Sequence, residues 1–406
     1  MGVFASENNI FRKPIGHCKN RDSPYPRTKL EIVYMQNGKE KIIIVGLRIL
    51  GESIEFYEES MAELGRLVES AGGEVIARLD QSREKPVPAT FIGKGKLDEL
   101  KSIVEMEKCY SVIFDDDLKP NQKRNIEYAL GGEVKVIDRS GLILDIFASR
   151  AKTAEAKIQV ELAQLEYLRP RLTGMWEHLS RQYGGSIGAR GPGEKQLETD
   201  RRVLDKRISV LRRKLGQIEK QRRVRRQHRK GVFRVALLGY TNAGKSTLLN
   251  AITNARAFAG NKLFATLDPR TRVYRYTTGR KVLFTDTVGF IRKLPHHLVE
   301  SFRSTLAEAG EADIIIIVAD ASHPALRDHL EVVSAELERM EIDGRRRLLV
   351  LNKTDLIDDT AYAELTRRYS GPEVVFVSAK IGTGIDRLLD KILEYIPTLS
   401  VSENPI

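Results

Sequence analysis

The sequence predicts an α/β protein with a small N-terminal parallel-sheet domain, a long α-helical hairpin and a larger C-terminal α/β domain. Three observations predict this organisation. Short apolar runs alternate with helical patterns over 41–139 and again over 231–396, which is typical of parallel sheets covered by helices. Between these regions the strand pattern disappears and apolar residues recur at heptad spacing. A glycine-rich segment starting at Gly239 follows a predicted strand directly and opens a predicted helix.

The N-terminal domain is predicted to span 31–150. Residues 1–30 carry proline, asparagine, arginine and lysine without an apolar core, so we expect a flexible tail. The tail lacks the apolar stretch of a secretory signal. The predicted strands are 41–50, 74–79, 111–114 and 134–137, and the predicted helices are 54–71, 97–108 and 121–130.

The middle segment, 151–230, is predicted to be an antiparallel helical hairpin that packs as a coiled coil. Pro170 should kink or break its first helix. The glycines of 184–193 cannot remain helical, so this stretch predicts a loop at the tip of the hairpin. The apolar seam comprises Ile158, Leu162, Leu165 and Leu172 in the first helix, and Leu197, Leu204, Ile208, Leu211, Leu215 and Ile218 in the second.

The C-terminal domain, 231–400, is predicted to be a second sheet in which loops at the strand ends bind a nucleotide. Its predicted strands are 233–238, 271–276, 281–285, 313–319, 347–351 and 373–377.

A P-loop is predicted at the end of the first of these strands. Its glycines let backbone N–H groups surround phosphates at a helix N-terminus. Lys245 would bridge the β- and γ-phosphates, and the Ser246 hydroxyl would bind Mg²⁺. The segment comprises Gly239, Tyr240, Thr241, Asn242, Ala243, Gly244, Lys245, Ser246 and Thr247.

Two later loops predict that the base is guanine. Guanine presents two adjacent donors, which one carboxylate, that of Asp355, can accept. Lys353 would lie along the base, and Asn352 would tie this loop to the P-loop. A backbone N–H from the segment Ser378, Ala379 and Lys380 would reach guanine O6. We therefore expect GTP and GDP as ligands.

The remaining predicted site residues surround the γ-phosphate and Mg²⁺. Asp286, Thr287, Val288 and Gly289 follow a strand, where Asp286 would hold Mg²⁺ through water and the Gly289 N–H would sense the γ-phosphate. Thr266 is the candidate switch threonine, although Thr271 lies close to it. The predicted catalytic residues are Lys245, Thr266 and Gly289, and the predicted metal ligands are Ser246, Thr266 and Asp286.

These motifs predict a Ras-like P-loop G domain that hydrolyses GTP with Mg²⁺. Phe290 occupies the position after Gly289, where a Ras-like GTPase has the glutamine that orients the attacking water. Intrinsic hydrolysis should therefore be slow until a partner binds. Asn242 would help bind K⁺ beside the phosphates; a role in capping the loop alone is an equal alternative.

Charge is concentrated on one segment. Residues 200–230 contain 14 Lys/Arg against 3 Asp/Glu, so an excess of 11 accounts for most of the net charge of +12. This basic helix predicts a polyanionic partner, above all nucleic acid. Two cysteines, Cys18 and Cys109, form no disulfide framework and fit a reducing cytoplasm. No apolar run is long enough to cross a bilayer, and we expect a monomer.

The whole pattern resembles the HflX family of ribosome-associated GTPases from about residue 41 to 396. Three segments outside the G-domain motifs carry the resemblance: 91–96, 136–147 and 190–202. The resemblance implies that the tip loop enters the peptidyl-transferase region of the large ribosomal subunit. Ser186 and Lys195 depart from the family pattern. Because the sequence stops soon after the last predicted helix, we expect the extra C-terminal domain of some members to be absent.

The expected function is therefore a GTPase that binds the large ribosomal subunit and couples GTP hydrolysis to ribosome remodelling, splitting or rescue. One alternative is a GTPase that monitors assembly of the large subunit. Another is an RNA-binding regulator for which GTP is only a conformational ligand, a possibility that Phe290 supports.

Overall fold

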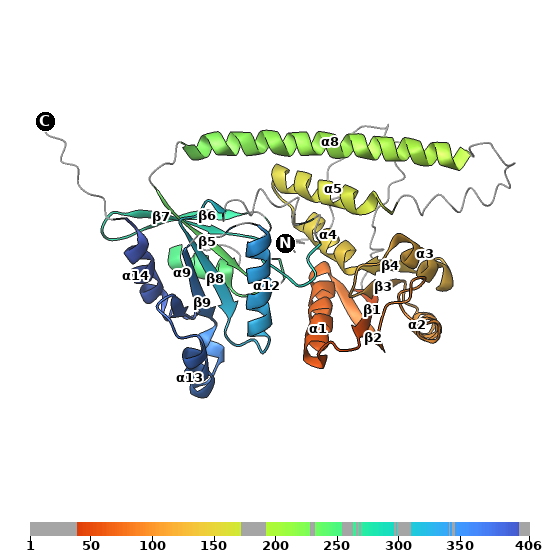
Figure 1. The fold of residues 1–406 in the computed structure, drawn as a ribbon, viewed down its shortest axis with the longest axis horizontal. Helices are drawn as coiled ribbons and strands as arrows, with labels where there is room; N and C mark the ends of the chain where they lie inside the picture. Colours follow the sequence, from red (N-terminus) through yellow and green to blue (C-terminus); the bar gives the residue numbers. More distant parts are fainter. Residues whose placement is uncertain are drawn as a thin grey trace, which may run out of the picture. The chain divides into compact units, whose positions relative to one another are not determined.

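A computed structural model describes residues 39–171, 192–227, 232–253, 263–264, 267, 269–295, 298, 310–340, 342 and 346–397. Residues Tyr34–Ile406 form one compact unit. The described chain contains two β-sheets and two long helices between them in sequence, which confirms the predicted α/β fold class (Figure 1). The predicted tail, Thr266 and residues 184–191 of the predicted tip loop lie outside the described residues.

The first sheet is parallel throughout and has the strand order β2-β1-β3-β4. Strand β2 runs four residues beyond its predicted end, because its polar second half pairs with β1 as far as Arg83 opposite Ile49. The strands are β1 (Glu40–Ile49), β2 (Gly73–Arg83), β3 (Ser111–Phe114) and β4 (Lys135–Asp138). The helices are α1 (Ile54–Ala71), α2 (Lys94–Glu107), α3 (Pro120–Ala129) and α4 (Arg139–Arg150).

Side chains of β1 alternate between two cores, as a strand with period two requires. Ile42 and Ile44 pack in the core that contains residues of α1 and α4. Ile43 and Val45 pack in the core that contains residues of α2 and α3. The first sheet is therefore covered on both faces, which explains why β1 is apolar almost without interruption.

The hairpin consists of α5 (Ala154–Leu168) and α8 (Pro192–Gln227). Leu162 is buried against Leu204, Ile208 and Leu211, so these members of the predicted seam pack as expected. Helix α5 ends two residues before Pro170, close to the point where the sequence predicts that proline kinks or breaks the first helix. Pro192 and Gly193 belong to α8 rather than to the loop that the sequence predicts; proline fits the first helical turn because its missing N–H has no intrahelical partner there.

The second sheet has the order β10-β9-β8-β5-β7-β6. Strand β6 pairs antiparallel at the edge, and the other pairs are parallel. Its strands are β5 (Phe233–Gly239), β6 (Arg270–Arg275), β7 (Lys281–Asp286), β8 (Ile314–Asp320), β9 (Arg346–Asn352) and β10 (Val374–Phe376). Helices α9 (Lys245–Thr253), α12 (Leu326–Arg339), α13 (Asp359–Arg368), α14 (Ile385–Tyr395) and the short η1 (Thr354–Leu356) accompany them.

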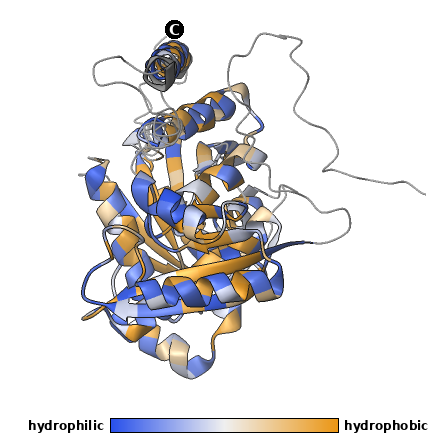
Figure 2. Ribbon diagram, turned by 90° about the vertical axis from the view of Figure 1, so that its right-hand side faces the viewer, coloured by the Kyte–Doolittle hydropathy of each residue, from blue (hydrophilic) through white to orange (hydrophobic). Residues whose placement is uncertain are grey.

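Hydrophobic strands lie beneath helices with hydrophilic outer faces in Figure 2. Strand β5 is central, with Val235 and Leu237 in one buried core and Ala236 and Leu238 in another. Strand β5 lies between β8 and β7 and ends at Gly239. Since α/β sheets of this kind bind ligands at the carboxyl ends of their strands, Gly239 lies where a ligand is expected.

Candidate nucleotide site

The loop between β5 and α9 has a backbone that depends on two glycines. Gly239 has a φ of 150°, and a Cβ there would collide with the carbonyl group of Val318 on the neighbouring strand. Gly244 has a φ of 92°, and a Cβ there would collide with the side chain of Asn352. The tight loop and the close approach of a second loop therefore both require glycine.

Lys245 begins α9, and its ammonium group is turned back onto its own loop. Its Nζ donates to the carbonyl oxygens of Tyr240 at 2.8 Å and of Gly239 at 3.1 Å. Burial lowers the pKa of Lys245 to about 8, although the nearby carboxylate of Asp286 favours the charged form. An ammonium group held in this way is suited to binding an anion that would stabilise its charge.

Two predicted metal ligands meet beside this lysine. Ser246 Oγ donates to Asp286 Oδ2 at 2.6 Å. Asp286 ends β7, where its backbone is paired with Leu237 of β5, and its side chain is buried. A hydroxyl and a carboxylate form the all-oxygen donor set that Mg²⁺ prefers, so the residues present fit this ion.

The segment after β7 closes against the P-loop. Thr287 Oγ1 donates to the Leu237 carbonyl at 2.8 Å, and Val288 is buried in the core shared with α1 and α4. A Cβ on Gly289 would lie 2.9 Å from Lys245 Nζ. Gly289 therefore lies directly against the lysine, where only a residue without a side chain fits.

Phe290 contributes backbone and packing at this point. Its N–H donates to the Gly239 carbonyl at 3.1 Å, and its carbonyl accepts from Thr241 N at 2.8 Å. Its side chain is only 2% exposed and packs with Ala236 and Leu238 in a buried core. A side chain in this position cannot orient a water molecule in the nucleotide site.

The predicted base-reading loops are joined to the P-loop by one asparagine. Asn352 Nδ2 donates to the Ala243 carbonyl at 2.9 Å, the contact expected of Asn352 from the sequence. Its Oδ1 accepts from Ala379 N at 3.0 Å, and Ser378 Oγ donates to Asp355 Oδ1 at 2.5 Å. Residues far apart in the sequence thus form a single polar cluster at the ends of β9 and β10.

Lys353 adopts a left-handed backbone, with a φ of 65°, and its Nζ pairs with Asp320 Oδ2 at 2.6 Å. Asp320 was missed by sequence reasoning; its position at the carboxyl end of β8 is the signal that would have found it. The ion pair holds the Lys353 stem in a fixed direction.

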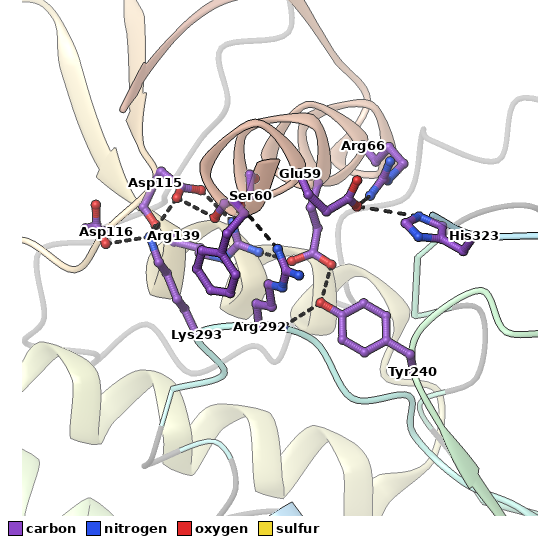
Figure 3. Close-up of polar contacts among 12 residues, drawn as sticks. Glu59, Ser60, Arg66, Asp115, Asp116, Arg139, Tyr240, Arg292, Lys293 and His323 are labelled. Carbon is purple, nitrogen blue, oxygen red and sulfur yellow. Dashed lines mark hydrogen bonds and ion pairs between the residues drawn. The ribbon is translucent and has the colours of Figure 1, made fainter. Parts of the chain in front are cut away.

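Tyr240 differs from the other P-loop residues because its side chain points away from the nucleotide site and toward α1. Its hydroxyl donates to Glu63 Oε1 on α1 at 2.6 Å. Figure 3 draws the Tyr240 ring with the hydrogen bonds of its hydroxyl as dashed lines. Any phosphate contact from Tyr240 would therefore come from its backbone. Sequence reasoning placed Tyr240 in the P-loop and gave no indication of this contact.

Within the described part of the chain, no helix is both long and apolar enough to cross a membrane.

The fold and these loops define the class of protein. The mostly parallel sheet with a central P-loop, the serine–aspartate pair and the Asn-Lys-x-Asp loop make the chain a P-loop GTP-binding protein that hydrolyses GTP. Three family models match: "GTP-binding GTPase N-terminal" over 58–148, "GTP-binding GTPase Middle Region" over 150–229 and "50S ribosome-binding GTPase" over 234–353.

The chain belongs to the HflX family of GTPases. It is 46% identical to the GTPase HflX of Lacrimispora saccharolytica over 90% of this chain and 85% of that protein. It is also 46% identical to GTPase HflX of Escherichia coli K12, over 83% of this chain and 79% of that one. The crystal structure of SsGBP in complex with GDP is 27% identical over 88% of this chain and 98% of that one, with a TM-score of 0.48.

Proposed function

We propose that this GTPase binds the large ribosomal subunit in the cytoplasm and couples GTP binding and hydrolysis to ribosome remodelling, splitting or rescue. The observation that carries the proposal is the basic surface of α8. A matched family model named for 50S ribosome binding supports it, as does membership of the HflX family.

Helix α8 has 36 residues and is therefore about 54 Å long. Its apolar seam faces α5, where Arg207 and Arg212 pair with Glu161 and Glu166. Other basic side chains on it are exposed: Arg201, Lys206, Arg213, Lys214 and Lys220. A long rigid rod that presents arginine and lysine to solvent suits the phosphate backbone of RNA.

We further propose the roles of the site residues. Asp355 reads guanine, Lys245 contacts the β- and γ-phosphates, and Gly289 senses the γ-phosphate. Ser246, Asp286 and Thr266 hold Mg²⁺, which would neutralise charge on the phosphates. K⁺ beside Asn242 is a second proposed cation; the φ of 62° at Asn242 is equally consistent with a role in shaping the loop.

The domain boundaries that we propose are 31–150, 151–230 and 231–400. Matches of the family models over 58–148, 150–229 and 234–353 support them.

Co-sedimentation with large subunits, compared between GDP and a non-hydrolysable GTP analogue, tests the proposal. We expect binding to be stronger with the analogue. GTP turnover should rise when ribosomes are added, and a splitting factor should release free subunits from intact ribosomes. Binding that does not depend on the nucleotide, together with unstimulated turnover, would contradict it.

The same measurements separate the other two functions. An assembly GTPase should respond to immature large subunits in preference to mature ones. An RNA-binding regulator should bind RNA but show no stimulation of hydrolysis. The buried side chain of Phe290 favours this function, because it cannot orient the attacking water. Deleting the predicted tip loop, 184–193, should leave ribosome binding largely intact and reduce the stimulation of hydrolysis, if this loop reports that the hairpin is bound in its place on the ribosome.

A further inference from the structure

Two adjacent buried residues, Asp138 and Arg139, belong to two different polar networks. Asp138 ends β4 and caps α4, and Arg139 is the first residue of α4. Both side chains are 0% exposed. They lie in the segment 136–147, which the sequence singles out and which the nucleotide site does not use.

Asp138 binds the C-terminal end of α5, from which the chain continues toward the predicted tip loop. Its Oδ1 accepts from Tyr167 Oη at 2.5 Å, and its Oδ2 accepts from Arg171 Nη2 at 2.7 Å. Tyr167 lies in the last turn of α5, and Arg171 lies just beyond the end of that helix. The Arg171 guanidinium also stacks 3.6 Å from the centre of the Tyr167 ring. The end of α5 is thus fixed to the sheet through one carboxylate.

Arg139 binds two further buried carboxylates. Its Nη1 donates to Asp115 Oδ1 at 2.6 Å, and its Nη2 pairs with Glu63. Both carboxylates are 1% exposed. Burial raises the pKa of Glu63, and the charge of Arg139 opposes that effect. A single guanidinium therefore positions two acidic groups of the first sheet and its helix α1.

The same two carboxylates are also bound by the nucleotide-binding part of the chain, and Figure 3 shows Lys293 with Asp115 and Asp116. Tyr240 Oη donates to Glu63 Oε1 at 2.6 Å and accepts from the backbone N–H of Arg292 at 2.9 Å. Lys293 Nζ pairs with Asp115 Oδ2 at 2.7 Å and with Asp116 Oδ1 at 2.6 Å. Tyr240 belongs to the P-loop, and Lys293 follows Gly289 by four residues.

The energetics of burial make this network sensitive to movement. A buried ionised group is stable only when its partners are in place, and removing one partner of a buried pair is strongly destabilising. Lys293 also has a left-handed backbone, with a φ of 52°, which a non-glycine residue adopts only when its surroundings hold it. A shift of the segment 289–293 must therefore have one of two results. It either breaks the contacts of Tyr240 and Lys293 with the two carboxylates, or it displaces these carboxylates and with them Arg139.

We infer that Asp138 and Arg139 couple the nucleotide state of the P-loop to the C-terminal end of helix α5 in the helical hairpin. Segments that contact the γ-phosphate in P-loop GTPases change their order on hydrolysis. Here such a segment ends in Arg292, whose backbone N–H donates to Tyr240 Oη, and in Lys293, which binds Asp115, one of the two carboxylates that Arg139 positions. The adjacent residue, Asp138, binds the end of α5. Tyr240, Lys293 and Arg171 are positioning residues in this coupling.

Because coupling between two sites is reciprocal, it can be measured in the isolated intact chain without ribosomes. The measured quantity is the ratio of the dissociation constants for GDP and a non-hydrolysable GTP analogue. We expect Arg171→Ala and Lys293→Ala to change this ratio by at least about fivefold, the lower end of typical coupling. Since both variants interrupt the same connection, they should converge on one ratio, and the double variant should change it no further.

Arg169→Ala is the matched control, because Arg169 pairs with Asp205 within the hairpin at 2.8 Å and is half exposed. It should leave the ratio within about twofold of the parent, below the typical range of coupling. Tyr167→Phe removes only the hydroxyl bound to Asp138. If Arg171→Ala does not fold, the ratio of dissociation constants in Tyr167→Phe tests the inference instead. Thermal unfolding verifies that each variant is folded.

A second readout is hydrogen exchange at the end of α5. Exchange of the Leu165 to Leu168 amides should differ between the GDP and analogue complexes of the parent, and Lys293→Ala should abolish that difference. The inference is overturned if folded Arg171→Ala and Tyr167→Phe both keep the parental ratio, or if α5 exchanges alike in both complexes. Neither result would bear on ribosome binding, so failure here is distinguishable from failure of the proposed function.

Discussion

Lys245 Nζ lies 2.8 Å from the carbonyl oxygen of Tyr240, so the P-loop lysine is bonded to the backbone of the loop that it serves. The contact keeps a buried ammonium group at the mouth of the phosphate-binding loop. It also connects Lys245 to the residue whose side chain reaches Glu63, at 2.6 Å. Tyr240 therefore contacts both the P-loop lysine and the buried carboxylate of Glu63.

Lys245→Ala should weaken GDP binding by about 1.5–3 kcal/mol, the range for hydrogen bonds to charged groups. Ser246→Ala should chiefly reduce the dependence of binding on Mg²⁺, because it removes a proposed metal ligand and no phosphate contact. Titration with labelled GDP at varied Mg²⁺ measures both effects. Equal affinity in the parent and Lys245→Ala would contradict the proposed role of the lysine.

Nucleotide binding should take up protons near pH 8. Burial lowers the pKa of Lys245 to about 8, so about half of the free protein carries the neutral amine at that pH. Bound phosphate stabilises the charged form, so affinity should fall as the pH rises above 8. Calorimetry at pH 8 in two buffers of different ionisation enthalpy should give an uptake of about half a proton relative to Lys245→Arg, whose guanidinium does not titrate.

Asp355→Asn should shift base preference from GTP to XTP, because an amide presents one donor and one acceptor where the carboxylate presents two acceptors. The loss of GTP affinity should be about 1.5–3 kcal/mol. Competition binding with both nucleotides measures the preference. Ser378→Ala is a useful comparison, since it removes the 2.5 Å contact to Asp355 and keeps the carboxylate. Unchanged GTP affinity in Asp355→Asn would refute the base-reading assignment.

Phe290→Gln should not accelerate hydrolysis, although it restores the residue type of Ras-like GTPases. The side chain at this position is buried among Ala236 and Leu238, so an amide there would be desolvated. We expect a loss of about 2–4 kcal/mol in the free energy of unfolding. Urea unfolding and single-turnover hydrolysis test this, with Phe290→Leu as the apolar control. Faster hydrolysis in a stable Phe290→Gln protein would show that the side chain can reach the site.

Ribosome binding should depend steeply on salt, and replacing Arg213 and Lys214 of α8 by alanine should flatten that dependence. For each RNA phosphate that the variant no longer neutralises, the slope of log K against log salt should fall by about 0.7–0.9. Arg367 and Arg368 are exposed on α13, so their replacement by alanine controls for net charge. Affinity of the isolated protein for GTP should not change. An identical salt slope in parent and variant would remove α8 from the proposed interface.

Local sequence determined most of the fold and the identity of the nucleotide-binding loops. Heptad spacing predicted the packing of Leu204, Ile208 and Leu211, because helix periodicity is a local property. Likewise Gly239 and Gly244 marked the P-loop, since the conformations that it needs are those that glycine allows. The order of the strands and the edge position of antiparallel β6 were not local properties, so the sequence did not predict them.

Tertiary structure alone decided which way side chains in these loops point. Tyr240 and Phe290 are each adjacent in the sequence to residues for which we propose nucleotide contacts, yet the Tyr240 side chain reaches Glu63 and the Phe290 side chain enters a buried core. Asp138 and Arg139 are neighbours whose ionisable partners lie 24 to 76 residues away, namely Asp115, Glu63, Tyr167 and Arg171. Such contacts depend on which distant segments meet once both sheets have formed. A buried charge requires those partners, but its own sequence neighbourhood does not specify them.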